Sequence, residues 1–384
     1  MKRLKEIPLL LKIIVAIILG ALLGLVAPGV AVRVMNTFCS IFSQLLGFMI
    51  PLIIVGLVTP AIARVGRGAG RMLLLTAVLA YGFTVLSGLF AYGFSTTLFP
   101  SLIDGSAATA LQEKGTEFAP YFTITIAPLM EVMTALVASF MLGLGIAAFD
   151  APTLRRGFEE FEDIITRAIA TAIIPLLPLF IFGLFLDMSA SGKVGPVLVA
   201  FVKVIAVIFT MTLVLLVLQY CVAGTIVRRN PLKLLVNMLP AYFTALGTSS
   251  SAATIPVTLR QTTANGVRPE IAGFVVPLCA TIHLSGSTLK ITSCAIALLM
   301  MQGQTVDFVQ MLGFVMMLGV TMVAAPGVPG GAIMAALGIL ESLLGFDASQ
   351  QAMMITLYIA MDSFGTACNV TGDGAIALIM NKVK

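Results

Sequence analysis

The sequence predicts an all-α polytopic membrane protein, and three observations lead to this fold class. The chain has 384 residues and is 59% hydrophobic but only 10% charged, whereas soluble domains are typically about 25% charged. Apolar runs of roughly 20 residues or more, long enough to span a bilayer as helices, recur along the chain. Lys and Arg gather in every second connection between these runs, which predicts cytoplasmic loops there and cytoplasmic termini.

Six apolar runs in the first 230 residues are predicted to be transmembrane helices. The first follows a basic start, but it is too long for a signal peptide and further runs follow it, so we interpret it as a transmembrane helix. The polar connection 101–121 carries Lys114 among acidic residues and is placed outside the cell. The predicted spans are 8–28, 35–63, 71–99, 126–149, 158–190 and 196–227.

Charge and cysteine content exclude other classes of protein. The net charge is +5, but the cations are few and lie between spans, so no nucleic-acid partner is expected. The five cysteines are odd in number and lie mostly in apolar segments, which argues against a disulfide framework. A soluble multi-domain protein would have to bury its apolar surface without lipid and is also excluded. The sequence therefore predicts a protein that lies in a membrane and contacts lipid.

Beyond residue 230 the apolar segments are interrupted. Segments 231–262 and 305–345 carry Gly, Pro, Ser and Thr at membrane depth, including the run Ser249, Ser250 and Ser251. Non-helical backbone cannot face lipid, because each unsatisfied N–H or C=O group costs several kcal/mol. Two such segments favour a site built from discontinuous helices, with the serines at the tip of a re-entrant hairpin. The alternative is that these small residues only allow helices to pack closely.

The last apolar segment carries a polar stripe. At about 100° per residue, Asp362, Thr366, Asn369 and Asp373 fall within roughly 60° of arc over about three turns of helix. Carboxylates inside a membrane are costly and usually face a cavity, an ion or a partner. This favours one carboxylate for an ammonium group and another for a cation. The alternative is a structural pair with Lys290 or Arg260.

A third polar group lies in the segment between the two interrupted ones. It contains His283, Ser285, Gly286, Ser287 and Lys290, and Gly286 among polar residues suggests a break in the helix. His283 is the one histidine in the chain. It is interpreted either as a hydrogen-bonded core residue or as a proton carrier.

Four stretches make the chain resemble the dicarboxylate/amino acid:cation symporter family, which includes glutamate transporters and neutral amino acid exchangers. They read GTSSSAATIPVT, PLCATIHLSGSTL, APGVPGGAIM and NVTGD. The resemblance implies eight transmembrane helices, two re-entrant helical hairpins, a homotrimer and an elevator mechanism. Residues 1–230 would then form mainly scaffold and trimerisation helices, with the third and sixth helices partly in the transport domain. The transport core would be 231–384, with hairpin 1 at 231–262, the seventh helix at 268–302, hairpin 2 at 305–345 and the eighth helix at 349–382.

The resemblance also implies site residues. Asp362 would bind a substrate amino group, and Asn369 would bind the substrate carboxylate. Asp373 would be the main sodium ligand. The substrate site implied in full is Ser250, Ser251, Ser287, Val328, Gly331, Asp362, Thr366 and Asn369, and the sodium ligands are Asp373, Asn369, Cys279 and Thr281.

Departures from the family pattern point to the substrate. Members that carry acidic substrates have an arginine one turn before the asparagine, where this chain has Gly365. Ser249 stands where some prokaryotic members carry another arginine. Without a guanidinium, nothing obvious neutralises a side-chain carboxylate. We therefore expect a small or polar neutral amino acid, with a dicarboxylate or an acidic amino acid as the alternative. If Asp362 pairs instead with Lys290, a ligand without an amino group is a further alternative.

Further departures point to altered coupling. His283 and Ser285 stand where the family has an Asn and an Asp that bind sodium, so this sodium site is expected to be weakened or lost. Lys290 replaces a common aromatic residue, and a buried ammonium can take the place of a bound cation. We expect fewer coupled Na⁺ ions than the family's three, or a proton carried by Lys290 or His283.

The sequence leaves two other classes of function as alternatives, an intramembrane protease and a channel. An intramembrane protease would need a serine nucleophile and base, or an aspartyl pair. Asp362 and Asp373 lie about 16 Å apart along one helix, too far to share a proton. A channel lined by the polar stripe is the second class, and saturable counterflow of substrate would distinguish a carrier from it. We expect a transporter and no enzymatic activity.

Overall fold

The computed structural model describes residues 9–67, 71–103, 118–149, 151–325 and 330–383, and all regular structure in these ranges is helical. This confirms the all-α fold class. The N-terminal helices are α2 (Leu9–Gly24), α3 (Gly29–Arg67), α4 (Arg71–Leu102), α6 (Val132–Ala148), α7 (Pro152–Ala168), α8 (Ile174–Ala190) and α9 (Val194–Val227). A π-helical turn, Ile169–Ile173, joins α7 to α8 without interrupting the helix.

Five helical segments of the described chain are long and apolar enough to cross a membrane: Gly29–Ala63, Arg71–Leu102, Pro152–Ala190, Val194–Val227 and Pro269–Met301. Together with shorter apolar helices they identify a multi-pass membrane protein. The span expected at 158–190 begins earlier, at Pro152. Its first turns carry exposed pairs such as Arg156 with Glu160, which hydropathy does not detect, and proline is well suited to the first position of a helix.

The C-terminal half consists of shorter helices separated by breaks. They are α10 (Pro231–Asn237), α11 (Leu239–Thr248), α12 (Ser251–Ala264), α13 (Pro269–Ile282), α14 (Ser285–Met301), α15 (Phe308–Val323), α16 (Gly331–Leu344), α17 (Ala348–Ala360) and α18 (Asp362–Val383). The seventh predicted helix breaks at His283 and Leu284, slightly before Gly286, which lies in the first turn of α14. The eighth predicted helix, 349–382, is also interrupted, at Met361, and this break was not expected.

The break after α11 has a local cause. Ser249 adopts a left-handed conformation with φ of 50°, which is uncommon outside glycine. Ser250 then caps α12, because its side chain accepts a hydrogen bond from the N–H of Ala253. The Ser249 hydroxyl is held 2.7 Å from that of Ser363. The backbone of Ser249 therefore ends α11, the Ser250 hydroxyl begins α12, and the Ser249 hydroxyl attaches the turn to α18.

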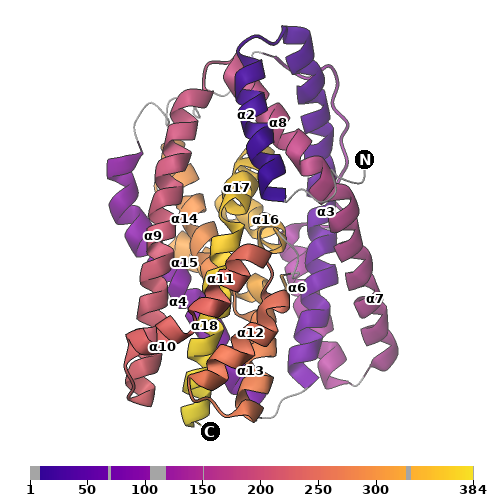
Figure 1. The fold of residues 1–384 in the computed structure, drawn as a ribbon. Helices are drawn as coiled ribbons and strands as arrows, with labels where there is room; N and C mark the ends of the chain where they lie inside the picture. Colours follow the sequence, from indigo (N-terminus) through magenta and orange to yellow (C-terminus); the bar gives the residue numbers. More distant parts are fainter. Residues whose placement is uncertain (1–8, 68–70, 104–117, 150, 326–329, 384) are drawn as a thin grey trace.

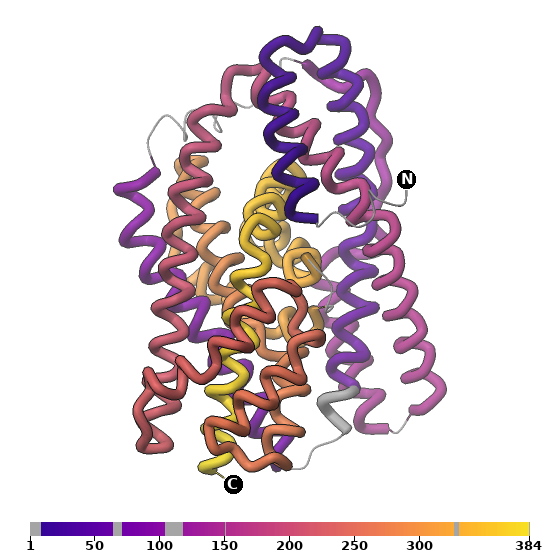
Figure 2. Tube along the Cα trace, in the orientation of Figure 1, coloured from indigo at the N-terminus to yellow at the C-terminus, as the bar shows by residue number. Residues whose placement is uncertain are grey.

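The interrupted helices gather in the middle of the molecule. Figure 1 shows them between α9 on one side and α3 and α7 on the other. In Figure 2 the C-terminus lies at the same end as the connection between α12 and α13. Helices α4 and α9 pack mainly against α14 and α18, whereas α2 packs against α8 and α3 against α6. The helices that carry the predicted site thus contact one another, with α4 and α9 as their main neighbours among the N-terminal helices.

Candidate functional site

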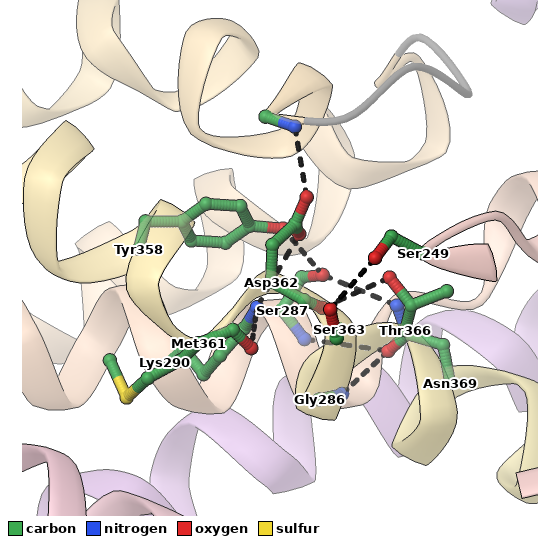
Figure 3. A network of polar contacts seen from close by, with 11 residues as sticks. Ser249, Gly286, Ser287, Lys290, Tyr358, Met361, Asp362, Ser363, Thr366 and Asn369 are labelled. Atoms are coloured by element: carbon green, nitrogen blue, oxygen red, sulfur yellow. Dashed lines mark hydrogen bonds and ion pairs between the residues drawn. The ribbon is translucent and has the colours of Figure 1, made fainter. Parts of the chain in front are cut away.

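The breaks in the C-terminal helices meet at a small polar cavity. Its volume is about 90 Å³, enough for a few water molecules or one small solute and below the roughly 300–1,000 Å³ of sites for drug-sized ligands. Figure 3 shows the polar contacts beside it. The lining residues are Ser249, Ser250, Ser251, Ala252, Ala280, Thr281, Leu284, Ser287, Ala325, Ala332, Tyr358, Asp362, Thr366 and Asn369.

Most of the predicted substrate residues lie together in this cavity. Six of the eight line it: Ser250, Ser251, Ser287, Asp362, Thr366 and Asn369. Gly331 begins α16 next to a lining residue, Ala332, but does not line the cavity itself. Val328 lies outside the described residues. The structure therefore brings together residues from α12, α14 and α18 that are up to 119 positions apart in the chain (250 to 369).

Asp362 is the charged side chain among the described lining residues. Its Oδ2 accepts a hydrogen bond of 3.0 Å from the backbone N–H of Gly330. Its Oδ1 lies 3.7 Å from Nζ of Lys290. The carboxylate begins α18, where the positive end of the helix dipole stabilises it. Asp362 therefore joins the start of α16 to α14 and still faces the cavity (Figure 3).

Lys290 lies behind the cavity and is 1% exposed. Its ammonium donates to the carbonyl oxygen of Met361 at 3.2 Å and lies 3.9 Å from the centre of the Tyr358 ring. The Met361 carbonyl is at the C-terminal end of α17, where a cation is favourable. A Cβ at Gly365 would lie 2.3 Å from both Cε and Nζ of Lys290. The lysine side chain therefore fills the place where a side chain at 365 would begin.

Asn369 organises the start of α14. Its Oδ1 accepts a hydrogen bond of 2.8 Å from the N–H of Gly286, and its Nδ2 donates to the Ser287 hydroxyl at 3.2 Å. The Ser287 hydroxyl is also 3.0 Å from that of Tyr358. The first N–H groups of a helix have no partner within it, so the amide of Asn369 replaces an N-cap across the helix break. The same side chain faces the cavity.

Replacement of Asn369 by alanine should therefore destabilise the protein. Asn369→Ala leaves the buried N–H of Gly286 without its acceptor, which typically costs about 1–3 kcal/mol. The thermal unfolding midpoint in detergent should fall. Thr263→Ala is the matched control, because the exposed Thr263 hydroxyl donates to the carbonyl of Leu259 within its own helix, and it should leave the midpoint almost unchanged. An unchanged midpoint for Asn369→Ala would contradict the capping role.

Two of the four predicted sodium ligands, Thr281 and Asn369, line the cavity, whereas Cys279 is buried and does not. Asp373 lies further along α18, where its Oδ1 is 2.8 Å from Nδ1 of His283. Both side chains are almost fully buried. The histidine ring thus takes one oxygen of the carboxylate expected to hold sodium.

Ser285 is also engaged by protein groups. Its hydroxyl accepts a hydrogen bond from Nε2 of Gln219 at 3.1 Å, and its carbonyl accepts one from the Ser87 hydroxyl at 2.8 Å. Oε1 of Gln219 and Nε2 of His283 are buried without a hydrogen-bond partner among the described residues. Both side chains crowd Gly372, because a Cβ there would lie 2.7 Å from Oε1 of Gln219 and from Cε1 of His283. This region combines a paired carboxylate with two buried polar atoms that have no hydrogen-bond partner among the described residues.

Three groups at this site were missed by sequence reasoning: Tyr358 lines the cavity, and Gly330 and Ser363 each contact a lining residue. Gly330 contributes its backbone N–H, and the sequence does not indicate which backbone groups bind a side chain. Ser363 lies between the stripe positions of α18, and only its contact with Ser249 gives it a role. Tyr358 lines the cavity and contacts the Ser287 hydroxyl, and its position one turn before Asp362 is the sequence signal that could have indicated this role.

Comparison with known proteins gives consistent matches. The model of the family described as "Sodium:dicarboxylate symporter family" matches residues 9–383. A serine/threonine transporter SstT of Acinetobacter baumannii (strain SDF) is 29% identical over 387 aligned residues, covering 96% of this chain and 95% of that protein. Proteins of the same name from Streptococcus suis (strain 05ZYH33) and Streptococcus thermophilus (strain CNRZ 1066) are 27% and 25% identical. They cover 86% and 97% of this chain, and 94% and 96% of their own lengths.

Proposed function

The chain belongs to the sodium:dicarboxylate symporter family. We propose that it carries a small neutral amino acid across the bacterial plasma membrane together with a cation. As a member of this family it is a membrane transporter and not an enzyme. The observation that carries the choice of substrate is the cavity itself. Its described lining combines one carboxylate, one amide and several hydroxyls, without a cationic side chain.

Each part of a zwitterion has a matching group in this cavity. The α-ammonium would pair with Asp362, whose carboxylate lines the cavity. The α-carboxylate fits the amide of Asn369 and the N-terminus of α12, where Ser251 and Ala252 line the cavity and the helix dipole favours an anion. A small side chain with a hydroxyl would meet the serine hydroxyls. The names of the relatives, serine/threonine transporters, agree with this choice.

The position of Gly365 argues against an acidic substrate. Acidic-substrate members have an arginine there, and in this chain the ammonium of Lys290 occupies the adjoining space. Lys290 does not line the cavity, so it does not offer its charge to a second carboxylate. A buried carboxylate without a partner is costly, which supports a neutral side chain.

We propose that fewer Na⁺ ions are coupled than in the three-sodium pattern, or that a proton carried by His283 or Lys290 drives transport. The hydrogen bond between His283 and Asp373 supports this, because the imidazole takes a carboxylate oxygen that a sodium ion would otherwise use. Ser285 supports it as well, since it has no charge and its hydroxyl is held by Gln219.

Transport would follow the elevator mechanism implied by the family, in a homotrimer. Residues 231–384 would form the moving core, with two re-entrant hairpins at 231–262 and 305–345. The packing of α4 and α9 against α14 and α18 supports their partial assignment to that core. Both termini would be cytoplasmic.

The contact between Asp362 and Lys290 favours a second candidate class of substrate, a small carboxylate without an amino group. Asp362 lies close to Lys290, so its charge already has a partner when the cavity is empty. A small carboxylate without an amino group, such as a hydroxy acid or a dicarboxylate, would then bind through Asn369 and the serine hydroxyls. Direct comparison of a neutral amino acid with the hydroxy acid of the same side chain decides between them.

A thermal-shift screen of the purified protein tests the proposal. The twenty amino acids, their hydroxy-acid analogues and common dicarboxylates are each added with sodium, with potassium and at low pH. A neutral amino acid at 100 times its Kd should stabilise the protein by about 2.7 kcal/mol. Aspartate and glutamate should have no such effect. Stabilisation by dicarboxylates alone would reject the proposed substrate, and stabilisation by hydroxy acids alone would favour the second candidate.

A further inference from the structure

A second cavity lies between α9 and the C-terminal helices. Its volume is about 360 Å³, within the roughly 300–1,000 Å³ of sites for drug-sized ligands. The lining positions on α9 recur at helical spacing and so form one face of that helix. We call this cavity the α9 groove. Its lining residues are Val202, Ile205, Ala206, Ile208, Phe209, Thr212, Lys290, Met361 and Phe364.

The lining of the α9 groove leaves no hydrogen-bond donor of a side chain free. The Thr212 hydroxyl donates to the carbonyl oxygen of Ile208 at 2.8 Å, and the Lys290 ammonium donates to that of Met361 at 3.2 Å. The other lining side chains are apolar. A water molecule in a cavity needs about two to four polar partners. The groove therefore suits an apolar occupant and not water or a polar solute.

The α9 groove opens on an apolar surface of a membrane-spanning helix. Helix α9 is long and apolar enough to cross a membrane. Val202 and Phe209 line the groove and are 67% and 37% exposed. Exposed large apolar side chains continue along the helix at Val199, Leu213 and Val217. In a multi-pass membrane protein such a surface contacts lipid, so the groove is open to acyl chains.

An acyl chain would complete the packing of the groove. Side chains that line an empty space lose the dispersion contacts of the missing atoms. Lipid tails are as apolar as leucine, so a chain that enters the groove restores these contacts and needs no hydrogen bond. The rings of Phe209 and Phe364 meet edge to face, with 4.9 Å between their centres, and link α9 to α18 beside the groove. The occupant thus meets walls that are already in contact.

The α9 groove and the substrate cavity lie on two sides of the same residues. Lys290 and Met361 line the groove, and Asp362 lines the cavity. Met361 directly precedes Asp362, and Nζ of Lys290 lies 3.7 Å from Oδ1 of Asp362 (Figure 3). An occupant of the groove therefore packs against the residues that hold Asp362 in place.

We propose that the α9 groove binds an acyl chain of one membrane lipid, which packs against Lys290 and Met361 and stabilises the wall behind Asp362. The inference goes beyond the proposed function and does not depend on which substrate is carried. A second copy of this chain over the groove, or contact with the general lipid layer only, are outcomes that the test distinguishes.

The test uses the absence of tryptophan from the chain, because a single introduced tryptophan then reports only on its own surroundings. Phe209→Trp places this reporter in the groove. Phe274→Trp is the matched control, because Phe274 is also 37% exposed but lies on α13, outside the groove. Each full-length variant is purified free of lipid in a sterol-based detergent. It is then titrated with phosphatidylcholine that carries bromine on its acyl chains, since bromine quenches tryptophan fluorescence on contact.

Quenching of Phe209→Trp should saturate close to one lipid per protein, and unbrominated phosphatidylcholine should relieve it. Quenching of Phe274→Trp should not saturate at that ratio. Ala206→Phe puts a ring where the chain would lie, so it should remove the saturable quenching of Phe209→Trp. Val199→Phe adds the same ring at an exposed position of α9 outside the groove and should leave the quenching unchanged.

Thermal unfolding gives an independent measurement. Unbrominated phosphatidylcholine should raise the unfolding midpoint of the wild type and of Val199→Phe in a saturable way, and it should not raise that of Ala206→Phe. If Ala206→Phe does not fold, the comparison of the two tryptophan variants and the relief by unbrominated lipid still decide.

Three results would overturn the inference. Equal, unsaturated quenching of both tryptophan variants would show that only the general lipid layer touches the groove. No quenching of Phe209→Trp would show that protein, either another segment or a second copy, covers it. Saturable quenching that survives Ala206→Phe would place the lipid elsewhere. No amino acid is added in any arm, so none of these results bears on the proposed function.

Discussion

Asp362→Asn is expected to abolish measurable transport and also to destabilise the empty protein. The substitution removes the carboxylate proposed to bind the substrate ammonium. It also leaves Lys290 as a buried ammonium without its charged partner, and breaking a buried ion pair from one side typically costs about 3–5 kcal/mol. Uptake in proteoliposomes and the thermal unfolding midpoint measure the two effects separately.

A double-mutant cycle separates stability from binding. Lys290→Met added to Asp362→Asn removes the stranded charge, so the double variant should recover much of the unfolding midpoint. It should not recover transport, because the carboxylate is still absent. Asp307→Asn is the matched control for the chemical change, since Asp307 caps α15 and asparagine caps helices equally well. Strictly additive effects on the midpoint would show that the pair is not coupled.

The positions of the spans and the polar residues of the site were predictable because they follow local patterns. A bilayer requires long apolar runs, which hydropathy detects, and carboxylates on the last helix repeat at helical spacing. The serine run indicated a site because hydroxyl groups and broken helices at membrane depth are tolerated only where protein or a cavity covers them. Asp362, Asn369 and Ser287 accordingly lie where the stripe and the broken segments place them, around one cavity.

The contacts that distinguish this site were not predictable, because they join distant backbone and side-chain atoms. No proline or glycine at Met361 indicates the helix break there. The carbonyl of Met361 accepts a hydrogen bond from Lys290, 71 positions away. The N–H of Gly330 that donates to Asp362 is a backbone group, and every residue except proline carries one, so the residue type does not indicate the contact. The sequence suggested that Lys290 and Gly365 were two separate departures. In the structure the two departures depend on each other, because the Lys290 side chain occupies the space that the absence of a side chain at Gly365 leaves.

Because Lys290 occupies the space beside Gly365, substitution of this glycine is expected to have a large effect. Gly365→Arg alone should be destabilising and inactive, because its Cβ would approach Lys290 to 2.3 Å and its guanidinium would add a second buried cation. Lys290 could yield only by giving up its contacts with Met361 and Tyr358. Gly365→Ala tests the steric part alone, and overpacking of this kind typically costs about 1–3 kcal/mol. In a Lys290→Ala background the Gly365→Ala substitution should cost little further stability, because the side chain that the new Cβ meets is gone.

The combination Lys290→Met with Gly365→Arg should change the substrate. It exchanges one buried cation for another, so the net charge of the core is kept, and it frees the space that the arginine needs. A guanidinium facing the cavity would pair with a side-chain carboxylate, and charge-assisted hydrogen bonds of about 1.5–3 kcal/mol correspond to about 10–100-fold in affinity. Binding of aspartate or glutamate, measured by calorimetry against the neutral amino acid, should therefore appear in the double variant and not in either single variant. If the folded double variant binds only the neutral amino acid, the pairing of Lys290 with Gly365 does not determine which substrates are accepted.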